Sequence, residues 1–386
     1  MENKIHRICI FSAYFHPHFG GVEQYNYQLA TQMVKSGYQV YMVTFNTENQ
    51  VSREMLNGFQ IFRFPVFALF KERFPLPKMN HQFKLLFKEI RAFNPDCILA
   101  NTRFYTSTQL ALYLGKKTKK PLYIIEHGTG HLSLGNKFLD FLGRQYEHVI
   151  SHLIRKYAGG FFGVSKACNQ WLKHFGIESK GVVYNSVDTE HVFPNEYRVR
   201  ELYNLPPDSQ IIAFAGRLIK EKGVTELLAA FDRLSKKHQF LYLFIAGSGP
   251  LSETLSQFYA NNPRIIFLGA VSHENVLDLL KDSGLVVIPS YYPEGLPTLI
   301  LEAGLCKCAV VATPMGGTRE VIDRNNGMII QAGSAENIYS ALECLISDPE
   351  IINNMAENLH QKVISSYGWK KTTSDFLETL NSLQIC

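Results

Sequence analysis

The sequence lacks the features that mark membrane-spanning, disulfide-rich and repetitive proteins. No window of the 386 residues approaches the ~18 uninterrupted apolar residues of a membrane-spanning helix, and no low-complexity tract or internal repeat is present. Seven cysteines, an odd number without a CxxC pair, predict reduced, packed thiols in a cytoplasmic protein. The apolar run at residues 8–15 is too short for a signal peptide, so we expect a first strand there.

Length and composition are those of a two-domain globular protein. A chain of 386 residues is too long for one ordinary core, so two α/β domains are expected. The net charge of +5 is unevenly distributed: residues 1–190 carry 23 Lys and Arg against 13 Asp and Glu, and the remainder carries 16 against 21.

The basic half holds two concentrations of positive charge. One interleaves cations with phenylalanines over residues 62–91: Arg63, Lys71, Arg73, Lys78, Lys84, Lys88 and Arg91 with Phe62, Phe64, Phe67, Phe70, Phe74, Phe83 and Phe87. The other is Lys116, Lys117, Lys119 and Lys120. Such interleaving suits an anionic membrane surface, and it equally suits a solvated face over a buried Phe stripe. No recognition motif accompanies the charge, so no nucleic-acid partner is expected.

Strand-like apolar runs alternate with helix-length amphipathic segments along the whole chain. This alternation predicts parallel sheets covered on both faces, in two doubly wound Rossmann-like domains that face each other across a cleft. A polar stretch at 186–208 is the expected hinge, and the domains are placed at 1–190 and 191–369. The expected strands are 7–11, 39–44, 60–64, 97–100, 122–126, 160–164 and 181–184, then 211–215, 241–246, 265–268, 285–288, 309–312 and 327–330. Helical patterns include 22–36, 225–237, 274–281 and 335–347.

The segment PSYYPEGLPTLILEAG, residues 289–304, is the most informative part of the sequence. Pro297 and Thr298 are expected to open a helix, where unpaired backbone N–H groups favour a phosphate. Gly295 and Leu296 precede the helix, and Glu294 and Glu302 place a carboxylate on either side of this phosphate cradle. The alternative is that Glu294 caps a loop and Glu302 is a solvated helix residue.

Other candidate groups follow strands whose carboxyl ends should meet at a ligand site. Arg217 and Lys222, between Gly216 and Gly223, would neutralise a diphosphate without a metal, or they are solvated loop charges. His127 lies at the end of another strand, where it either contacts the substrate or makes a structural hydrogen bond.

Two glycine-rich turns also follow strands. Gly20 and Gly21 allow close backbone approach at a helix start. Gly247 and Gly249 suggest a nucleotide-facing loop, but Ser252 stands where a dinucleotide fingerprint needs its third glycine, which disfavours hydride transfer. His16 and His18 have no third ligand at suitable spacing, so no metal is assigned.

Taken in order, these residues resemble the family-4 glycosyltransferases of the GT-B fold. The matching elements cover nearly the whole chain: Gly20–Glu23, Glu126–Gly128, Asn185–Asp188, Gly216–Leu218, Lys222–Gly223, Gly247–Pro250, Pro293–Pro297 through Glu302, Val311–Glu320, Gly327 and Tyr367–Trp369. One departure is Ser186, where the family usually has glycine.

The resemblance implies a retaining, metal-independent transferase that uses a nucleotide diphosphate sugar, with UDP the expected nucleotide and no further cofactor. Arg217 and Lys222 would hold the diphosphate, assisted by amides near Gly21 and at Leu296–Thr298. Glu302 would bind the ribose, while Glu294 and His127 would contact the sugar.

The same resemblance implies roles for the two domains and a place in the cell. Residues 1–190 would bind a glycan or lipid-linked acceptor, residues 191–369 would bind the donor, and a helix at 370–386 would cross back to the first domain. We expect cell-surface polysaccharide biosynthesis at the cytoplasmic face of the membrane. An epimerase on the same scaffold and a catalytically silent scaffold subunit remain alternatives.

Overall fold

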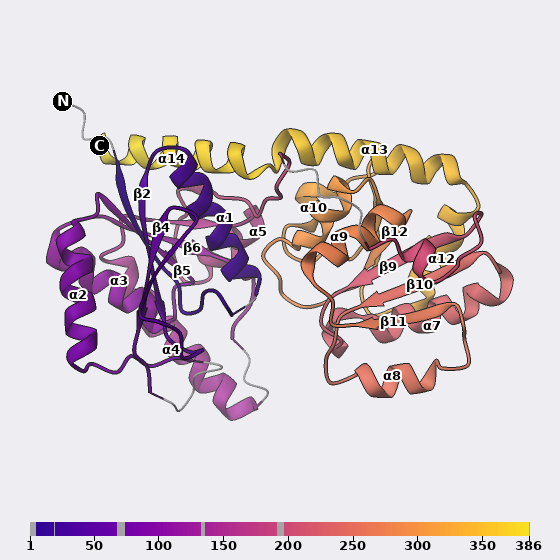
Figure 1. Ribbon diagram of the computed structural model, residues 1–386, viewed down its shortest axis with the longest axis horizontal. Coiled ribbons are helices and arrows are strands. Elements are labelled where there is room, and N and C mark those ends of the chain that lie inside the picture. The colour runs from indigo at the N-terminus through magenta and orange to yellow at the C-terminus, as the bar shows by residue number, and fades with distance from the viewer. Residues whose placement is uncertain (1–4, 19, 68–73, 133–135, 191–196, 386) are drawn as a thin grey trace. The chain divides into compact units, whose positions relative to one another are not determined.

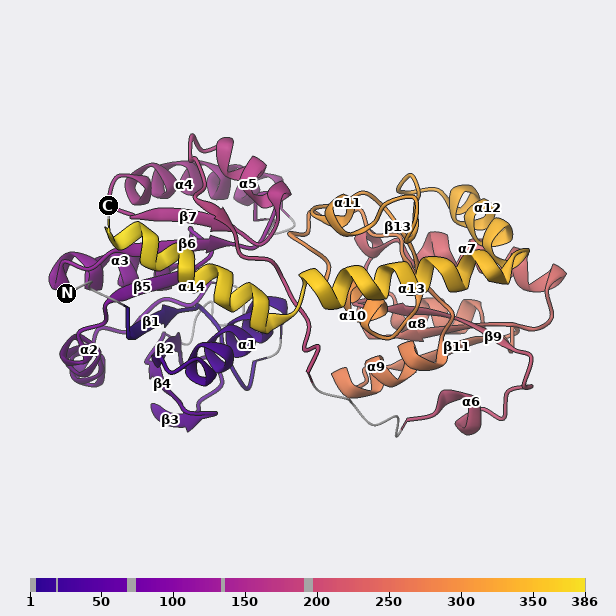
Figure 2. The ribbon, with the colours of Figure 1, turned by 90° about the horizontal axis from the view of Figure 1, so that it is seen from above.

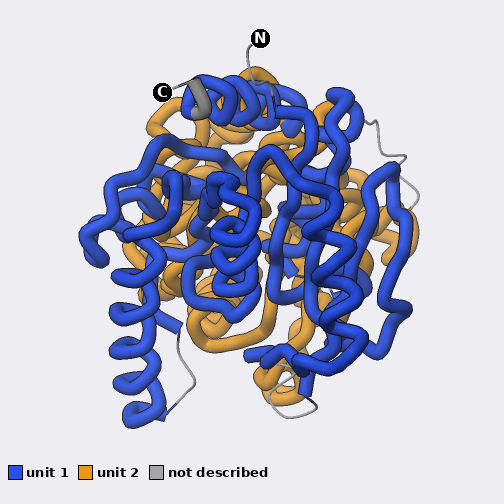
Figure 3. Tube along the Cα trace, turned by 90° about the vertical axis from the view of Figure 1, so that its left-hand side faces the viewer, with its two compact units in different colours: residues 1–185, 369–386 blue, residues 186–368 orange. Residues whose placement is uncertain are grey.

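The computed structural model describes residues 5–18, 20–67, 74–132, 136–190 and 197–385. The chain forms two compact units, Met1–Asn185 with Trp369–Cys386 (unit 1) and Ser186–Gly368 (unit 2), coloured separately in Figure 3. Each unit is a sheet with helices on both faces (Figure 1).

Unit 1 is built on an eight-stranded sheet in the order β3-β4-β2-β1-β5-β6-β7-β8, counted over the described residues. All pairings are parallel except that of β3 with β4. The strands are β1 Arg7–Phe11, β2 Gln39–Phe45, β3 Arg53–Leu56, β4 Phe59–Phe64, β5 Cys97–Asn101, β6 Leu122–Glu126, β7 Gly160–Gly163 and β8 Gly181–Val182. The helices are α1 Gly21–Lys35, α2 His81–Phe93, α3 Thr106–Thr118, α4 Lys137–Arg155, α5 Lys166–Lys173 and α14 Trp369–Ile385.

Helices cover both faces of this sheet, so its strands carry apolar side chains on both faces. On one face, α1 and α14 lie against each other (Figure 2), and Leu29 and Met33 of α1 share a core with Phe376 and Leu380 of α14. On the other face, α2, α3 and α4 form a second core with the alternate residues of the strands. The last helix of the chain therefore completes the core of the unit that contains its first strand.

Unit 2 has a six-stranded, all-parallel sheet in the order β11-β10-β9-β12-β13-β14. Helices α7 and α12 cover one face, and α9, α10 and α13 cover the other. The strands are β9 Gln210–Ala215, β10 Leu241–Ala246, β11 Ile265–Gly269, β12 Leu285–Ile288, β13 Ala309–Ala312 and β14 Met328–Ile329. The helices are α6 Val199–Leu202, η1 Lys220–Lys222, α7 Val224–Lys237, α8 Ser252–Phe258, α9 His273–Asp282, α10 Thr298–Leu305, α11 Thr318–Val321, α12 Ala335–Ile346 and α13 Pro349–Ser366.

The strand order of unit 2 reverses direction between β9 and β12, and that of unit 1 reverses between β1 and β5. In doubly wound sheets, ligands bind beyond the carboxyl ends of the strands at such a reversal. These two points therefore define where each unit can hold a ligand.

The predicted α/β class and its two doubly wound parallel sheets are confirmed. One strand was missed: three of the four residues of β3 are exposed and apolar residues do not alternate with polar ones, so the residues REML carry no strand signal. Strands β8 and β14 are shorter than the predicted runs 181–184 and 327–330.

The chain passes between the units at 185/186 and again at 368/369, whereas the first boundary was predicted at 190/191. Inside unit 2 the two connections run side by side, because Val187 N–H donates to Tyr367 O at 2.9 Å and Val187 pairs with Gly368 in a parallel bridge. Part of the predicted hinge, residues 191–196, lies outside the described residues.

The described residues of the basic and aromatic stretch at 62–91 divide between the core and the surface, where Phe67 is 51% exposed and Lys78, Lys84, Lys88 and Arg91 are also exposed. Arg63 is buried, and it pairs with Glu54 at 2.7 Å and donates to the carbonyl of His16 at 2.8 Å. Phe62, Phe64 and Phe83 are core residues, because β4 and α2 pack them against the sheet. These three phenylalanines form a buried stripe, while Phe70, Lys71 and Arg73 lie outside the described residues. Within the described chain, no helix combines the length and the hydropathy that crossing a bilayer requires.

Candidate functional site

The strongest cluster of predicted residues lies at the reversal point of unit 2. Arg217 and Lys222 belong to the connection from β9 to α7, and Glu294 belongs to the connection from β12 to α10. Since β9 and β12 are adjacent parallel strands, their carboxyl ends bring the two connections together. The site therefore lies where a doubly wound sheet binds a ligand.

Lys222 and Glu294 are in direct contact, with Nζ and Oε1 2.5 Å apart. The same Glu294 oxygen accepts a hydrogen bond from Ser290 Oγ at 3.1 Å, and the Lys222 ammonium lies 5.8 Å from the centre of the Tyr292 ring. Both charged side chains remain partly exposed, at 24% and 18%. They form an accessible ion pair that an anionic ligand can rearrange.

Arg217 differs from Lys222 in its surroundings. Its side chain is exposed at the end of β9, and the structure gives it no polar partner among the described residues. A guanidinium in solvent can approach a phosphate in a bidentate manner without first losing an internal ion pair. The predicted pair of cations is therefore present, with one of the two already neutralised by a carboxylate.

Helix α10 begins as predicted, with Pro297 at its N-cap and Thr298 as its first residue. No side chain caps this end, so its first N–H groups lie beside the buried Gly295–Leu296 turn without a capping carboxylate or hydroxyl. Glu302, one turn inside the helix, contacts His273 of α9, with Oε1 3.1 Å from Nε2. This hydrogen bond to the carboxylate raises the pKa of His273 above its ordinary value.

The glycines of unit 2 bring loop backbones into contact. Gly247 has a φ of +133°, and a Cβ there would overlap the backbone of Gly216. A Cβ on Gly249 would lie 2.6 Å from the carbonyl oxygen of Leu218. The loops after β9 and β10 are thus closely packed, which accounts for these glycines whether or not they also face a nucleotide.

Two further glycines were not singled out from the sequence as site residues. Gly316, at φ +52°, leaves no room for a side chain against the carbonyl oxygen of Glu294, and Gly317 N–H donates to Gly295 O at 2.7 Å. The loop after β13 therefore holds the Glu294 loop in position. A Gly-Gly turn directly after a strand was the available signal.

Unit 1 has its own candidate group beside the reversal between β1 and β5. His127, after β6, lies 2.7 Å through Nε2 from Asn101 Oδ1, and Asn101 Nδ2 donates to Phe11 O at 3.3 Å. The Asn101 amide oxygen thus accepts from His127 Nε2–H, so the neutral ring presents Nδ1 as an acceptor. The Tyr25 ring packs edge-on against the imidazole at 4.7 Å, and burial lowers the pKa of His127 to about 3. The ring is neutral at physiological pH.

Gly20 and Gly21 lie at the start of α1, as predicted, with Gly20 as the N-cap. The buried Glu23 carboxylate folds back over Gly20, where a Cβ would overlap it, and burial raises the pKa of Glu23. A carboxylate at a helix start is favourable by the same electrostatics that would attract a phosphate. An anionic ligand at this position has to share the helix start with Glu23.

A buried cluster of charged residues contacts the backbone of His127, and no sequence motif indicated this cluster. Arg103 is fully buried and pairs with Glu126 at 2.5 Å and with Glu147 of α4 at 2.7 Å. Glu126 Oε1 in turn accepts from the backbone N–H of His127 at 3.2 Å. A buried charge needs such partners, so this cluster fixes the backbone at the end of β6.

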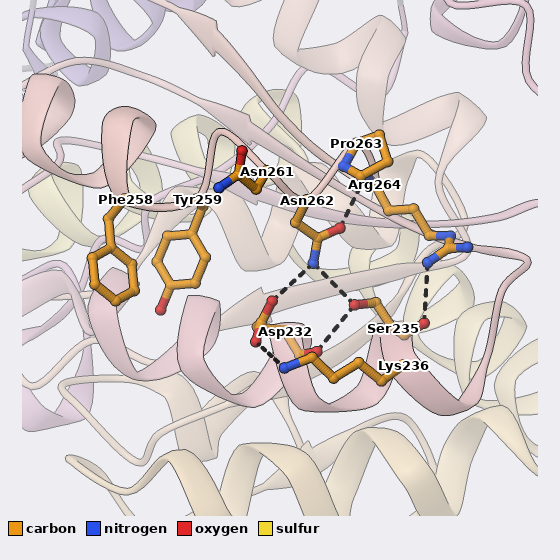
Figure 4. Close-up of a pocket in the computed structure, with 9 residues that line it drawn as sticks. All are labelled: Asp232, Ser235, Lys236, Phe258, Tyr259, Asn261, Asn262, Pro263 and Arg264. Atoms are coloured by element: carbon orange, nitrogen blue, oxygen red, sulfur yellow. Dashed lines mark hydrogen bonds and ion pairs between the residues drawn. The ribbon is translucent and has the colours of Figure 1, made fainter.

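A hollow of about 400 Å³ in unit 2 is not part of this site (Figure 4). It lies between α7 and the loop that precedes β11, and its polar groups are largely bonded to each other. Asn262 Nδ2 donates to Asp232 and Ser235, each at 3.0 Å, Lys236 pairs with Asp232 at 2.8 Å, and Arg264 donates to Ser235 O at 3.2 Å. None of the predicted site residues lines this hollow.

Two family models match consecutive parts of the chain. Residues 19–191 match the model "Glycosyltransferase Family 4", and residues 197–362 match "Glycosyl transferases group 1". The chain is a family-4 glycosyltransferase of the GT-B fold.

Individual relatives and solved structures match this glycosyltransferase over nearly the whole of this chain. An uncharacterized glycosyltransferase of Methanocaldococcus jannaschii is 27% identical over 98% of both chains. A human phosphatidylinositol N-acetylglucosaminyltransferase chain is 26% identical over 96% of this chain and 74% of its own. Among solved structures, Anabaena HepE in complex with UDP and glucose superimposes with a TM-score of 0.73 at 19% identity, over 98% of this chain and 100% of that chain.

Proposed function

We propose that this glycosyltransferase moves a sugar from a nucleotide diphosphate sugar, with UDP as the nucleotide, to a glycan or lipid-linked saccharide, with retention of anomeric configuration. The observation that carries the proposal is the contact between Lys222 and Glu294 at the reversal point of unit 2. It places an ammonium for a diphosphate beside a carboxylate for sugar hydroxyls. The solved complex of HepE with UDP and glucose supports the choice of donor class.

In this proposal the diphosphate is bound by Arg217, Lys222 and the uncapped start of α10. Negative charge grows on the leaving phosphate as the glycosidic bond breaks, and preorganised cations and amides stabilise that charge best. These groups replace a metal at the diphosphate. When the diphosphate binds, Lys222 pairs with the phosphate and gives up part of its contact with Glu294. The Glu294 carboxylate is then available to the sugar.

The remaining residues position the donor. Glu302 accepts hydrogen bonds from the ribose hydroxyls, and its present contact with His273 keeps the carboxylate in place. The Nδ1 acceptor of neutral His127 suits a sugar hydroxyl. Double displacement would need a second carboxylate about 5 Å from Glu294 as the nucleophile, and the proposal assigns none. Displacement from the face of the leaving phosphate is therefore the proposed course.

We place the acceptor at a membrane surface because of helix α4. Phe138, Leu142, Val149 and Leu153 follow one another along one face of this helix and are 68%, 47%, 61% and 46% exposed; we call them the apolar stripe. The opposite face carries Glu147, Ser151 and Ile154 into the core. Lys137, Arg144 and Arg155 are exposed on another face of the same helix, and cations beside exposed apolar residues are typical of helices that lie on anionic bilayers. The name of the human relative, which includes phosphatidylinositol, supports a lipid-linked acceptor.

A thermal-shift screen with UDP, GDP and ADP, combined with two lysine variants, tests the donor site. UDP should raise the Tm of the wild type most, since a ligand that binds only the folded state stabilises it. Lys222→Ala should lower sugar transfer about 10²-fold or more through loss of transition-state charge stabilisation. Lys220→Ala, the matched control, removes an exposed cation from the same short helix and should leave transfer unchanged.

Other outcomes would separate the alternatives. Equal transfer by the Lys222→Ala variant and the wild type would remove Lys222 from the reaction. Conversion of a UDP-sugar to its epimer without any acceptor would favour the epimerase. Nucleotide binding without turnover on any acceptor tested would favour the silent scaffold, and NMR of the product anomer decides between retention and inversion.

A further inference from the structure

Three histidines from separate segments of unit 1 gather on one surface, outside the candidate donor site. His131 follows β6 in the chain, His148 lies in α4, and His174 ends α5. One ligand atom from each lies within 4.8 Å of the others. No metal was predicted from the sequence, because these histidines are too widely spaced along the chain to form a recognisable motif.

His131 is held in the orientation and tautomer of a metal ligand. Its Nδ1 lies 3.2 Å from Glu147 Oε2, and Glu147 is itself fixed by Arg103 at 2.7 Å and by the backbone N–H of Leu132 at 2.8 Å. A carboxylate bound to a guanidinium accepts hydrogen bonds, so Nδ1 carries the proton and Nε2 keeps its lone pair. A carboxylate behind a histidine in this manner is the usual outer-shell arrangement of metal sites.

The other two rings complete an open site. The His174 ring stacks on Trp171 at 4.9 Å, and its centre is 5.3 Å from that of His131 and 5.0 Å from that of His148. Tetrahedral coordination at metal–nitrogen distances of about 2.0–2.1 Å needs the nitrogens roughly 3.4 Å apart. His148 and His174 are exposed, so rotation of their side chains can close this gap without moving the backbone.

We propose that His131, His148 and His174 bind one divalent transition-metal ion of the Zn²⁺ type, with solvent at the remaining position. Three neutral imidazoles are ligands that such ions prefer over Mg²⁺ or Ca²⁺. The ion would tie α4 and α5 to the segment that follows His127. It would thereby stabilise unit 1 at a place separate from the diphosphate-binding residues of unit 2.

Metal titration of the full-length, tag-free protein tests the site after treatment with a chelator. Zn²⁺ should bind at one ion per chain and raise the Tm, and Co²⁺ should give the visible absorption of a four-coordinate ion. His148→Ala and His174→Ala should each weaken Zn²⁺ binding at least tenfold. Because both side chains are exposed, these variants are expected to fold. His152→Ala, which removes another exposed histidine of α4, should bind Zn²⁺ like the wild type.

Two results would overturn the proposal. One is the absence of saturable Zn²⁺ binding by the wild type, and the other is equal affinity in all four proteins. The readouts use no sugar donor, so they are independent of the proposed transferase activity.

Discussion

At the scale of single residues, Lys222 and His127 acquire their properties from partners that are distant in the sequence. Lys222 is paired by Glu294, and His127 is kept neutral by burial against Tyr25 and oriented by Asn101. A neutral imidazole is an acceptor for a hydroxyl and does not attract a phosphate. Its contacts with Tyr25 and Asn101 therefore make His127 a hydrogen-bond acceptor.

The lowered pKa of His127 has a consequence for stability that can be measured. Its pKa is about 3 in the folded chain and near 6.5 when exposed, so between these values the unfolded chain binds the additional proton. Stability is therefore lost as the pH falls below 6.5, by at most about 1.4 kcal/mol for each pH unit. His127→Gln should flatten this slope in urea unfolding measured between neutral pH and about pH 5.

The control for that experiment is His152→Gln, an exposed histidine of the same unit, which should retain the wild-type slope. Identical slopes for His127→Gln and the wild type would mean that the imidazole of His127 is accessible to protons in the folded protein.

At the scale of elements, the connections after β9, β10, β12 and β13 are in close backbone contact with one another. Gly247, Gly249 and Gly316 permit backbone to lie directly on backbone, so the loop positions depend on one another. The short helices η1 and α10 then present Lys222 and their N–H groups from a rigid base. These backbone contacts fix the positions of the candidate site residues.

Gly247→Ala should be strongly destabilising for this reason. The substitution combines a φ of +133° with overlap on the backbone of Gly216, and such strain and overpacking cost about 2–4 kcal/mol together. Thermal unfolding should show a Tm lower by roughly 5 °C or more. Gly284→Ala is the matched control in unit 2, since a Cβ there meets no atom within 4 Å. Equal Tm values for the two variants would show that the loops relax independently.

The helices and strands were largely predictable from the sequence, whereas the side-chain contacts between distant segments were not. Apolar runs and glycine turns indicated most strands and the start of α10, because these features are local in sequence. The rule for parallel strands placed the candidate groups at one edge of a sheet. The ion pair between Lys222 and Glu294, the burial of Arg63, the carboxylate of Glu23 over Gly20 and the histidine cluster depend on packing between segments, most of them far apart in the chain.

At the scale of the whole molecule, charge and exposed apolar surface are both concentrated in unit 1. Residues 1–190 carry 23 Lys and Arg against 13 Asp and Glu, so the excess positive charge lies entirely in this part, and α4 adds the apolar stripe to it. The helix is amphipathic in an unusual sense, because its buried face carries Glu147 and Ser151 while its exposed face carries phenylalanine and leucine. The proposed acceptor at a membrane surface rests on this exposed apolar surface.

Replacement of the apolar stripe should therefore weaken membrane binding without unfolding the protein. A variant with Phe138, Leu142, Val149 and Leu153 all changed to Ser should sediment less with vesicles that contain anionic lipid. Removal of these side chains takes apolar area out of the bilayer at about 25 cal/mol per Å². The matched control is Phe258→Ser, which removes a phenylalanine that is 75% exposed on α8 of unit 2 and should bind vesicles like the wild type. Binding of the wild type should fall as salt is added and on neutral vesicles, since each cation near an anionic surface contributes about 1 kcal/mol. If the quadruple variant and the wild type sediment equally with anionic vesicles, the stripe faces water or another protein, and the acceptor does not reach the enzyme through a membrane at this helix.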